Sequence, residues 1–376
     1  MLRQLARLGR RVPFAGDRAL ALAVYADGLN EPVRAGESGY EGVACVDDAA
    51  RAFDLYCALW EATRLPWVRR WCEGLLDFVL AMQGADGRWV NFILDWEGMP
   101  NRTGRTSIAG GHFWQARAVL ALAHAAPILD DERIEPALRR GLPHILAATD
   151  VASDVRALHI RAALALAGQP DDHGLGGRLP LWCEELLSCR DGDVLMNSLD
   201  ERGAPHLWGH IQEGVLAEVA VRLGRDDWLA IAGRSAELVF ASAVRSGFDL
   251  VRVQPYDVAS AVYSLSRLAA TTGNPAFGSL VTLSRAWFDG RNPAGRPVYD
   301  RLEGRMGDGV DRQCVSTRSG AEANIVGAEA LFDDAVAVAS RLTDAKGLPQ
   351  GVEEAGDARI PSRGEENASA RARQAS

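Results

Sequence analysis

Strand patterns, long hydrophobic runs, paired cysteines and basic stripes are scarce or missing in this 376-residue sequence. No apolar stretch approaches the roughly 20 residues that cross a bilayer, and no signal-like segment opens the chain. A formal net charge of −9 without a basic stripe argues against nucleic acid and anionic membranes as partners. We therefore expect a cytoplasmic protein that binds neither nucleic acid nor membrane.

The six cysteines are scattered and lack the CxxC or Cys/His spacing of a metal site. Most lie in helical patterns, where a thiol behaves as a small hydrophobic group, so we expect reduced, structural cysteines. Calcium loops, phosphate-binding glycine loops and the H-E-x-x-H and G-x-S-x-G motifs are also missing. The sequence therefore predicts no metal site and no obligatory cofactor.

What the chain does contain is apolar residues at helical spacing, in units of about 15 residues separated by Gly, Pro and Asp. This pattern predicts a single all-α domain over residues 1–343. The tail 344–376 is poor in aromatics and rich in charge, Gly, Ser and Ala, which predicts disorder. The expected helices span 17–29, 47–63, 66–82, 111–126, 132–148, 152–167, 178–188, 210–223, 226–242, 256–271, 275–288 and 318–341.

Two kinds of helix alternate. Segments 47–63 and 111–126 are apolar almost all round, as in helices buried on every side, whereas 66–82 and 132–148 keep a charged stripe. This alternation favours a ring of helical hairpins with inner and outer helices. Most links between hairpins are long, and in a closed ring they emerge on one face and form a cleft there. These links are 30–46, 83–110, 189–209, 243–255 and 289–317.

Asp47 and Asp48 stand together at the head of the inner segment 47–63, at the rim of the expected cleft. A carboxylate at a helix start can cap the open backbone amides, a contact worth about 0.5–2 kcal/mol. We expect Asp47 to be chiefly a cap. Asp48 lies inside the first turn, so we expect it to project toward the cleft and to be functional.

Other polar and aromatic residues occupy the starts of inner helices or the long links. Aromatic rings beside carboxylates are typical of a sugar site, because rings stack on C–H faces while acids bind hydroxyls and transfer protons. The sequence therefore indicates a carbohydrate site. Its expected binding residues are Asp47, Trp89, Trp96, His112, Trp208, His210, Glu213, Tyr256, Asp257 and Arg318, and its candidate catalytic residues are Asp95, Glu322 and Asp48.

Three motifs carry a resemblance to a known family: "DDAARA" from Asp47, "NFILD" from Asn91 and "RSGAE" from Arg318. With the alternating helices, they resemble the six-hairpin glycosidase superfamily, whose fold is the (α/α)6 toroid. The nearest resemblance is to bacterial glycosyltransferase-associated proteins with "DDNARA", "NF…YDR" and "NRNSGAES" motifs. This chain departs from them at Ala49, at Trp96 and in "GGHFWQAR", residues 110–117.

A rival resemblance lies in "QGADGRW", residues 83–89, which fits the Q-x-x-x-G-x-W signature of terpenoid cyclases. The same residues can simply tie a helix end to a turn around a buried Trp89. No D-x-D-D or D-D-x-x-D motif accompanies the signature, so the cyclase is the weaker alternative.

The resemblance implies an enzyme that acts on glycosidic bonds of an oligosaccharide or glycoconjugate, in the manner of a glycoside hydrolase or phosphorylase. We expect Asp95 and Glu322 to be the catalytic pair, with Asp48 in reserve. Arg318 fits either an anionic substrate or an ion pair with Glu322. The alternative is a catalytically silent toroid that binds a glycan or scaffolds a glycosyltransferase.

Overall fold

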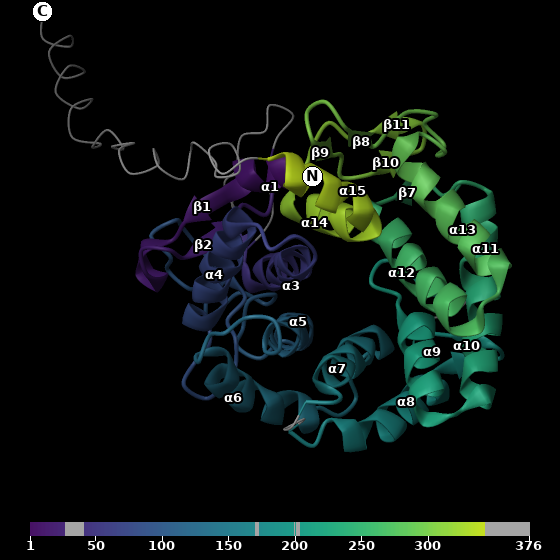
Figure 1. The fold of residues 1–376 in the computed structure, drawn as a ribbon, viewed down its shortest axis with the longest axis horizontal. Coiled ribbons are helices and arrows are strands. Elements are labelled where there is room, and N and C mark those ends of the chain that lie inside the picture. The colour runs from purple at the N-terminus through teal and green to yellow at the C-terminus, as the bar shows by residue number, and fades with distance from the viewer. Residues whose placement is uncertain (27–40, 170–172, 199, 201–203, 343–376) are drawn as a thin grey trace, which may run out of the picture.

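Six helices form a closed inner ring in the computed structural model, which describes residues 1–26, 41–169, 173–198, 200 and 204–342 (Figure 1). Each inner helix contacts the next along the chain, and the last contacts the first. This closed contact order defines the ring. Its members are α3 (Val46–Thr63), α5 (His112–Ala125), α7 (Ser153–Leu166), α9 (Gln212–Leu223), α12 (Pro255–Thr272) and α14 (Ala321–Ala330).

An outer layer of helices surrounds this ring. Five of the outer helices follow their inner partners and pack against them, while the first and last helices of the described chain pack on α14. The expected all-α (α/α)6 toroid is thereby confirmed. The outer helices are α4 (Pro66–Ala81), α6 (Ile134–Leu146), α8 (Leu179–Ser188), α10 (Asp226–Val239), α13 (Pro275–Ala286), α1 (Leu2–Leu8) and α15 (Phe332–Arg341), and the short α11 (Ala241–Arg245) follows α10.

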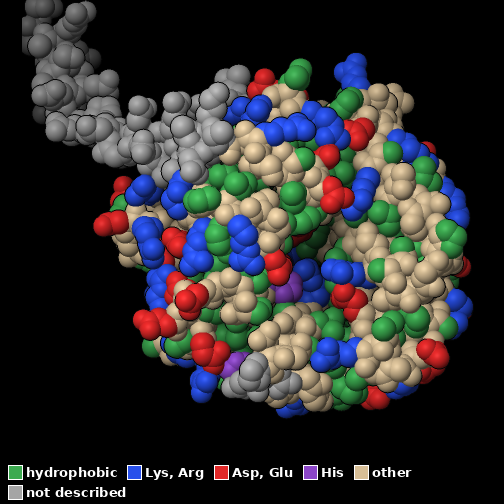
Figure 2. Space-filling view, viewed as in Figure 1, with side chains coloured by type: hydrophobic (Ala, Val, Ile, Leu, Met, Phe, Trp, Pro, Cys, Tyr) green, Lys and Arg blue, Asp and Glu red, His purple; other side chains and the backbone are tan. Residues whose placement is uncertain are grey.

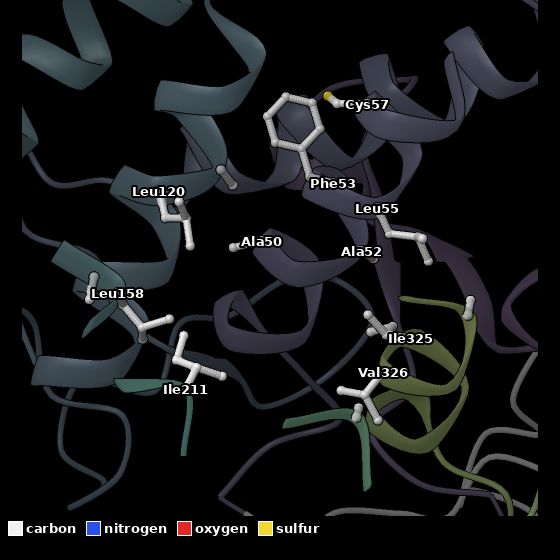
Figure 3. Close-up of a cluster of buried hydrophobic side chains, with 14 of the residues drawn as sticks. Ala50, Ala52, Phe53, Leu55, Cys57, Leu120, Leu158, Ile211, Ile325 and Val326 are labelled. Carbon is white, nitrogen blue, oxygen red and sulfur yellow. The ribbon is translucent and has the colours of Figure 1, made fainter. Parts of the chain in front are cut away.

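The alternation of helix types has the expected physical basis. On α3, the small side chains of Ala50 and Ala52 and the ring of Phe53 are all buried, and Leu120 of α5 and Ile325 of α14 belong to the same cluster (Figure 3). Small apolar residues let neighbouring inner helices approach closely, and the large ones fill the remaining space. The inner ring therefore provides a rigid support for the loops above it.

Short antiparallel strands join the loops, and one pair fixes the entry into α3. β3 (Ala44–Cys45) pairs with β4 (Phe92–Ile93), with Cys45 opposite Phe92, so the loop before α5 lies beside the start of α3. The remaining pairs are β1 (Gly9–Arg11) with β2 (Leu20–Leu22), β5 (Arg190–Asp191) with β6 (Val194–Leu195), β8 (Tyr299–Asp300) with β9 (Arg305–Met306), and β10 (Val310–Asp311) with both β7 (Arg252–Val253) and β11 (Cys314–Val315).

Two expectations about elements were wrong. The segment 17–26 contains β2 rather than a helix, because its buried run Leu20–Leu22 pairs with β1, and such a short apolar run fits either structure. The expected single helix 318–341 breaks at Leu331, where φ is −110° and ψ is 46°. Residues 27–29 of the first segment and the predicted tail 344–376 lie outside the described residues.

The described residues contain no helix that is both long and apolar enough to cross a membrane. Their cysteines are all free, with Cys45, Cys57, Cys72 and Cys183 buried. Cys314 departs from the expected pattern, because it lies exposed on β11.

Candidate active site

The N-terminal ends of the inner helices meet on one face of the ring. Arg51 near the start of α3 contacts Glu322 at the start of α14, with 2.8 Å between Nη2 and Oε1. Arg117 of α5 donates from Nη2 to the hydroxyl of Tyr256 on α12 at 2.8 Å. These contacts join four helices that are far apart in sequence, so the site depends on closure of the ring.

The start of α3 is held by residues other than its two aspartates. The Asp48 backbone amide donates to Sγ of Cys45 at 3.4 Å, and the Asp47 amide donates to Oδ1 of Asn91 at 3.0 Å. The expectation that Asp47 caps this helix is therefore wrong, because Cys45 occupies the N-cap position. Both carboxylates are left available for side-chain partners.

Arg51 is the centre of the carboxylate cluster. Its Nη2 atom lies 3.2 Å from Oδ2 of Asp47, 2.9 Å from Oδ1 of Asp48 and 2.8 Å from Oε1 of Glu322. The Arg51 side chain is only 10% exposed. A single guanidinium thus draws three carboxylates together in a poorly solvated site, where each charge interacts more strongly than in water.

A second guanidinium supports this arrangement from α5. Arg117 also binds Asp47, through Nη1 and Oδ2. The guanidinium of Arg51 lies over the Tyr256 ring at 5.2 Å, and that of Arg117 lies over it at 5.8 Å. Two cations therefore lie near the Tyr256 ring, whose face attracts positive charge.

The pKa values of the two neighbouring aspartates are shifted in opposite directions. Burial alone raises the pKa of Asp47, but the adjacent Arg117 and Arg51 outweigh it and hold the pKa below its usual range. Burial raises the pKa of Asp48 to about 6; the attraction of Arg51 opposes this rise, and the charges of Glu322 and Asp47 add to it. Adjacent carboxyls whose environments separate their pKa values are typical of acid–base sites.

A cavity of about 570 Å³ opens over this cluster. Three side-chain atoms buried at or beside it, Oδ1 of Asp47, Nη1 of Arg51 and Oδ2 of Asp308, have no hydrogen-bond partner among the described residues. Buried polar atoms are normally paired, so these three atoms show that the charged cluster is not fully satisfied by its own contacts. The polar lining comprises Tyr25, Asp47, Asp48, Arg51, Asn91, Arg252, Tyr256, Asp308, Asp311, Arg318 and Glu322, among others.

Two more aspartates beside this site also have raised pKa values. Burial raises the pKa of Asp308 to about 6, with a further contribution from Glu322, and Oδ1 of Asp308 accepts from the Gly320 amide at 2.6 Å. Burial likewise raises the pKa of Asp257 to about 6. Asp257, expected to bind substrate, instead closes a capping box with Gln254 at the start of α12, because Oδ2 accepts from the Gln254 amide at 2.7 Å.

Several expected site residues have structural roles instead. Trp89 is fully buried and donates from Nε1 to the carbonyl of Val79 at 2.8 Å. Asp95 lies in a turn, where its Oδ1 accepts from the amides of Gly98 and Met99. Neither residue lines the cavity. Asp95 and Glu322 are therefore not brought together as a pair by any described contact.

His210 and Glu213, also expected to bind substrate, belong to a buried network. Both side chains are fully buried, and Nε2 of His210 lies 2.9 Å from Oε1 of Glu213. The other ring nitrogen contacts Oδ1 of Asn197 at 2.6 Å, and Ser235 donates its hydroxyl to Glu213. This network fixes the loop before α9 and is closed to a ligand.

Trp208 on that loop does not line the cavity. It is 38% exposed and stacks on His206 with centroids 4.1 Å apart, and its ring lies 6.4 Å from that of Tyr256. His112 is exposed at the start of α5, and Trp96 is half-buried against the core; neither lines the cavity.

Arg318 lines the cavity, but its partner was not foreseen. Its Nη1 donates to the hydroxyl of Tyr25 at 2.5 Å. Glu322 pairs with Arg51 instead, and the described residues show no ion pair between Arg318 and Glu322.

Sequence reasoning missed Arg117 and Asp308. Arg117 stands in "GGHFWQAR", where a lone arginine on an otherwise apolar inner helix was the available signal. Asp308 sits in a glycine-rich loop that has no pattern of its own. Among the described residues, no group of three or more His, Cys, Asp or Glu side chains could hold a metal ion.

Comparison with known proteins identifies the fold. No family model and no curated protein matches the sequence. Solved structures that resemble it include a D-mannose isomerase (TM-score 0.67, 10% identity, 88% of this chain and 94% of that chain), a sugar epimerase from a ruminal bacterium (0.63, 13%, 90% and 95%) and the endoglucanase CelQ from Clostridium thermocellum (0.58, 11%, 89% and 69%). At these identities the likeness shows the fold, an (α/α)6 toroid shared by glycoside hydrolases and sugar isomerases.

Proposed function

We propose that this protein acts on glycosidic bonds of an oligosaccharide or glycoconjugate bound in the 570 Å³ cavity. The observation that carries this proposal is the pairing of a buried, weakly acidic Asp48 with Glu322, whose side chain is 43% exposed and ion-paired to Arg51. Glycosidic cleavage uses a pair of carboxyl groups, one of which takes up and gives a proton more readily than an ordinary carboxyl.

The spacing of the two groups is too short for an inverting pair. Oδ1 of Asp48 and Oε1 of Glu322 contact the same Arg51 nitrogen, at 2.9 Å and 2.8 Å, so the two oxygens can be no farther apart than the sum of these distances. Retaining pairs are about 5–5.5 Å apart, whereas inverting pairs leave room for a water at about 6.5–9.5 Å.

In a retaining mechanism Asp48 gives its proton to the glycosidic oxygen as the bond to the anomeric carbon breaks. The Glu322 carboxylate attacks that carbon and forms a glycosyl ester, which water or phosphate then cleaves as Asp48 takes the proton back. Arg51 positions both carboxylates.

The test compares Asp48→Asn and Glu322→Gln with Asp95→Asn as the matched control. On an oligosaccharide library screened for released sugar, we expect each of the first two variants to lower turnover at least 100-fold. Asp95→Asn keeps its turn-forming oxygen and should stay within about threefold of the wild type. Full turnover of Asp48→Asn and Glu322→Gln, or loss in Asp95→Asn alone, would refute the assignment.

A catalytically silent, glycan-binding toroid is the second candidate. It is favoured by the single Arg51 that ties all three carboxylates together, because a carboxylate held in an ion pair is a poorer nucleophile. Saturable oligosaccharide binding without release, phosphorolysis or transfer of sugar would support it. Scaffolding of a glycosyltransferase and a cytoplasmic location remain hypotheses, and the structural role of Trp89 weakens the cyclase alternative.

A further inference from the structure

A second cavity, of about 380 Å³, lies among the middle and C-terminal parts of the inner helices. Its lining includes Asp54 of α3, His124 of α5, Arg161 of α7, Tyr263 of α12 and Glu329 of α14. Figure 2 shows a hollow at the centre of the ring with basic, acidic and histidine side chains around it. The proposed glycosidic chemistry uses none of these five residues.

Two side chains separate the two cavities. Arg51 and Tyr256 line both of them, and Arg117 lines the second. Arg51 and Arg117 are already engaged by Asp47, Asp48 and Glu322 on the side of the first cavity. The charge available to a ligand in the second cavity therefore comes from its other residues.

Basic groups with unused donors face this second cavity. Arg285 of α13 donates from Nε to the carbonyl of Ala330 at 3.0 Å, and its two terminal nitrogens make no hydrogen bond or ion pair with the described residues. Arg161 is 3.5 Å from Oδ2 of Asp54, longer than the 2.7–2.9 Å of a strong charged hydrogen bond. Asp54 is shared, because His124 binds its other oxygen.

The remaining charged groups determine the net charge around the second cavity. Arg267 of α12 pairs with Glu218 of α9 at 3.1 Å, and Tyr263 donates its hydroxyl to Glu218 at 3.2 Å. Burial raises the pKa of Glu329 to about 7; the nearby Arg161 opposes this rise and Asp54 adds to it. Near neutral pH Glu329 is therefore only partly ionised, and Arg161 and Arg285 leave an excess of positive charge.

We propose that the second cavity binds a small organic anion of monosaccharide size, through a carboxylate or phosphate held between Arg161 and Arg285. Guanidinium groups are suited to these anions, since their planar donors match two oxygens at once. Leu120, Leu158 and the ring of Tyr263 provide apolar contact for the body of the ligand. This site goes beyond the proposed function and stands independently of it.

The experiment titrates the full chain with glucose 6-phosphate and glucuronate by calorimetry, with glucose as the neutral control. We expect one equivalent of either anion to bind, and glucose to bind at least tenfold more weakly. Arg285→Gln and Arg161→Gln should each weaken anion binding at least tenfold. Arg222→Gln, on the exposed end of α9, should leave it unchanged.

If Arg285→Gln fails to fold, Arg285→Lys replaces it as the test. This variant keeps the charge but loses the planar donors, so it should weaken anion binding by less than tenfold but measurably. Glu329→Gln should strengthen anion binding at pH 8, where the wild-type carboxylate repels the ligand.

Failure of both anions to bind at millimolar concentration, equal binding of glucose, or unchanged binding in Arg285→Gln would overturn the proposal. Loss in Arg318→Gln instead would place the anion in the first cavity, whereas loss of glycan turnover alone would leave this site unaffected.

Discussion

At the scale of single residues, Arg51 determines the electrostatics of the first cavity. Its side chain compensates three carboxylates and is only 10% exposed. We predict that Arg51→Gln lowers the free energy of unfolding by about 3–5 kcal/mol at pH 8, because the carboxylates are left close together and unpaired. Urea denaturation measures this loss.

The matched control is the double variant Arg51→Gln/Asp48→Asn, which removes one of the stranded charges. It should recover part of the stability that the single variant loses. A loss below about 1 kcal/mol in Arg51→Gln, or no recovery in the double variant, would show that the cluster tolerates its own repulsion.

Sequence reasoning located the carboxylates better than it assigned their roles. Asp48, Glu322 and Tyr256 could be predicted at the cavity because each stands at the start of an inner helix. Position along a helix does not say which partner a side chain meets. Asp47 was therefore expected to cap, and the contribution of Arg117 from a neighbouring helix was not foreseen.

At the scale of elements, the turn after α4 shows why "QGADGRW" is structural. Gly87 has φ of +86°, and a Cβ there would lie 2.0 Å from the carbonyl oxygen of Arg140 on α6. Gln83 donates to the carbonyl oxygen of Ala137 at 2.9 Å, which ties the turn to the same helix. We predict that Gly87→Ala lowers stability by about 2–4 kcal/mol, since the turn and α6 must separate.

Gly192 offers a matched control in the β5–β6 turn. Its φ is +61°, but nothing lies within 4 Å of an added Cβ, so Gly192→Ala should cost only about 1 kcal/mol. Thermal melts of the two variants decide the matter. Similar losses would mean that backbone conformation alone, rather than the contact with α6, makes Gly87 necessary.

Helical elements were predictable where periodicity was long, and failed where it was short. Segments such as 47–63 and 256–271 have enough turns for an apolar pattern to identify them. Leu20–Leu22 is buried by pairing with β1, a contact with residues about ten positions earlier that local periodicity does not report. After the break at Leu331, α15 packs against α3, another contact between distant segments that local periodicity does not report.

At the scale of the whole molecule, the cavities should make stability depend on pH. The pKa is raised to about 6 in Asp48, Asp257 and Asp308, and to about 7 in Glu329, against roughly 3.9 and 4.3 in an unfolded chain. Folding therefore takes up protons between about pH 4 and 7, and stability must fall as pH rises through this window.

The lowered pKa values of Asp47 and Asp54 act in the opposite direction, and their stabilisation is lost as pH falls below about 4. We therefore predict the highest melting temperature near pH 4, with a decline toward pH 8. Asp48→Asn should flatten that decline, because the variant has no carboxyl to ionise. A wild-type melting temperature that rises from pH 5 to pH 8 would contradict the prediction.

Closure of the ring by α14 against α3 also sets the order of events during synthesis. The contact joins Val46–Thr63 to Ala321–Ala330, and residues of α12 and α14 line both cavities. Five hairpins can form from neighbouring segments as the chain emerges, but this last contact spans most of its length. Neither cavity is complete before α14 has been made, so the nascent chain has no ligand site until residues 321–330 leave the ribosome.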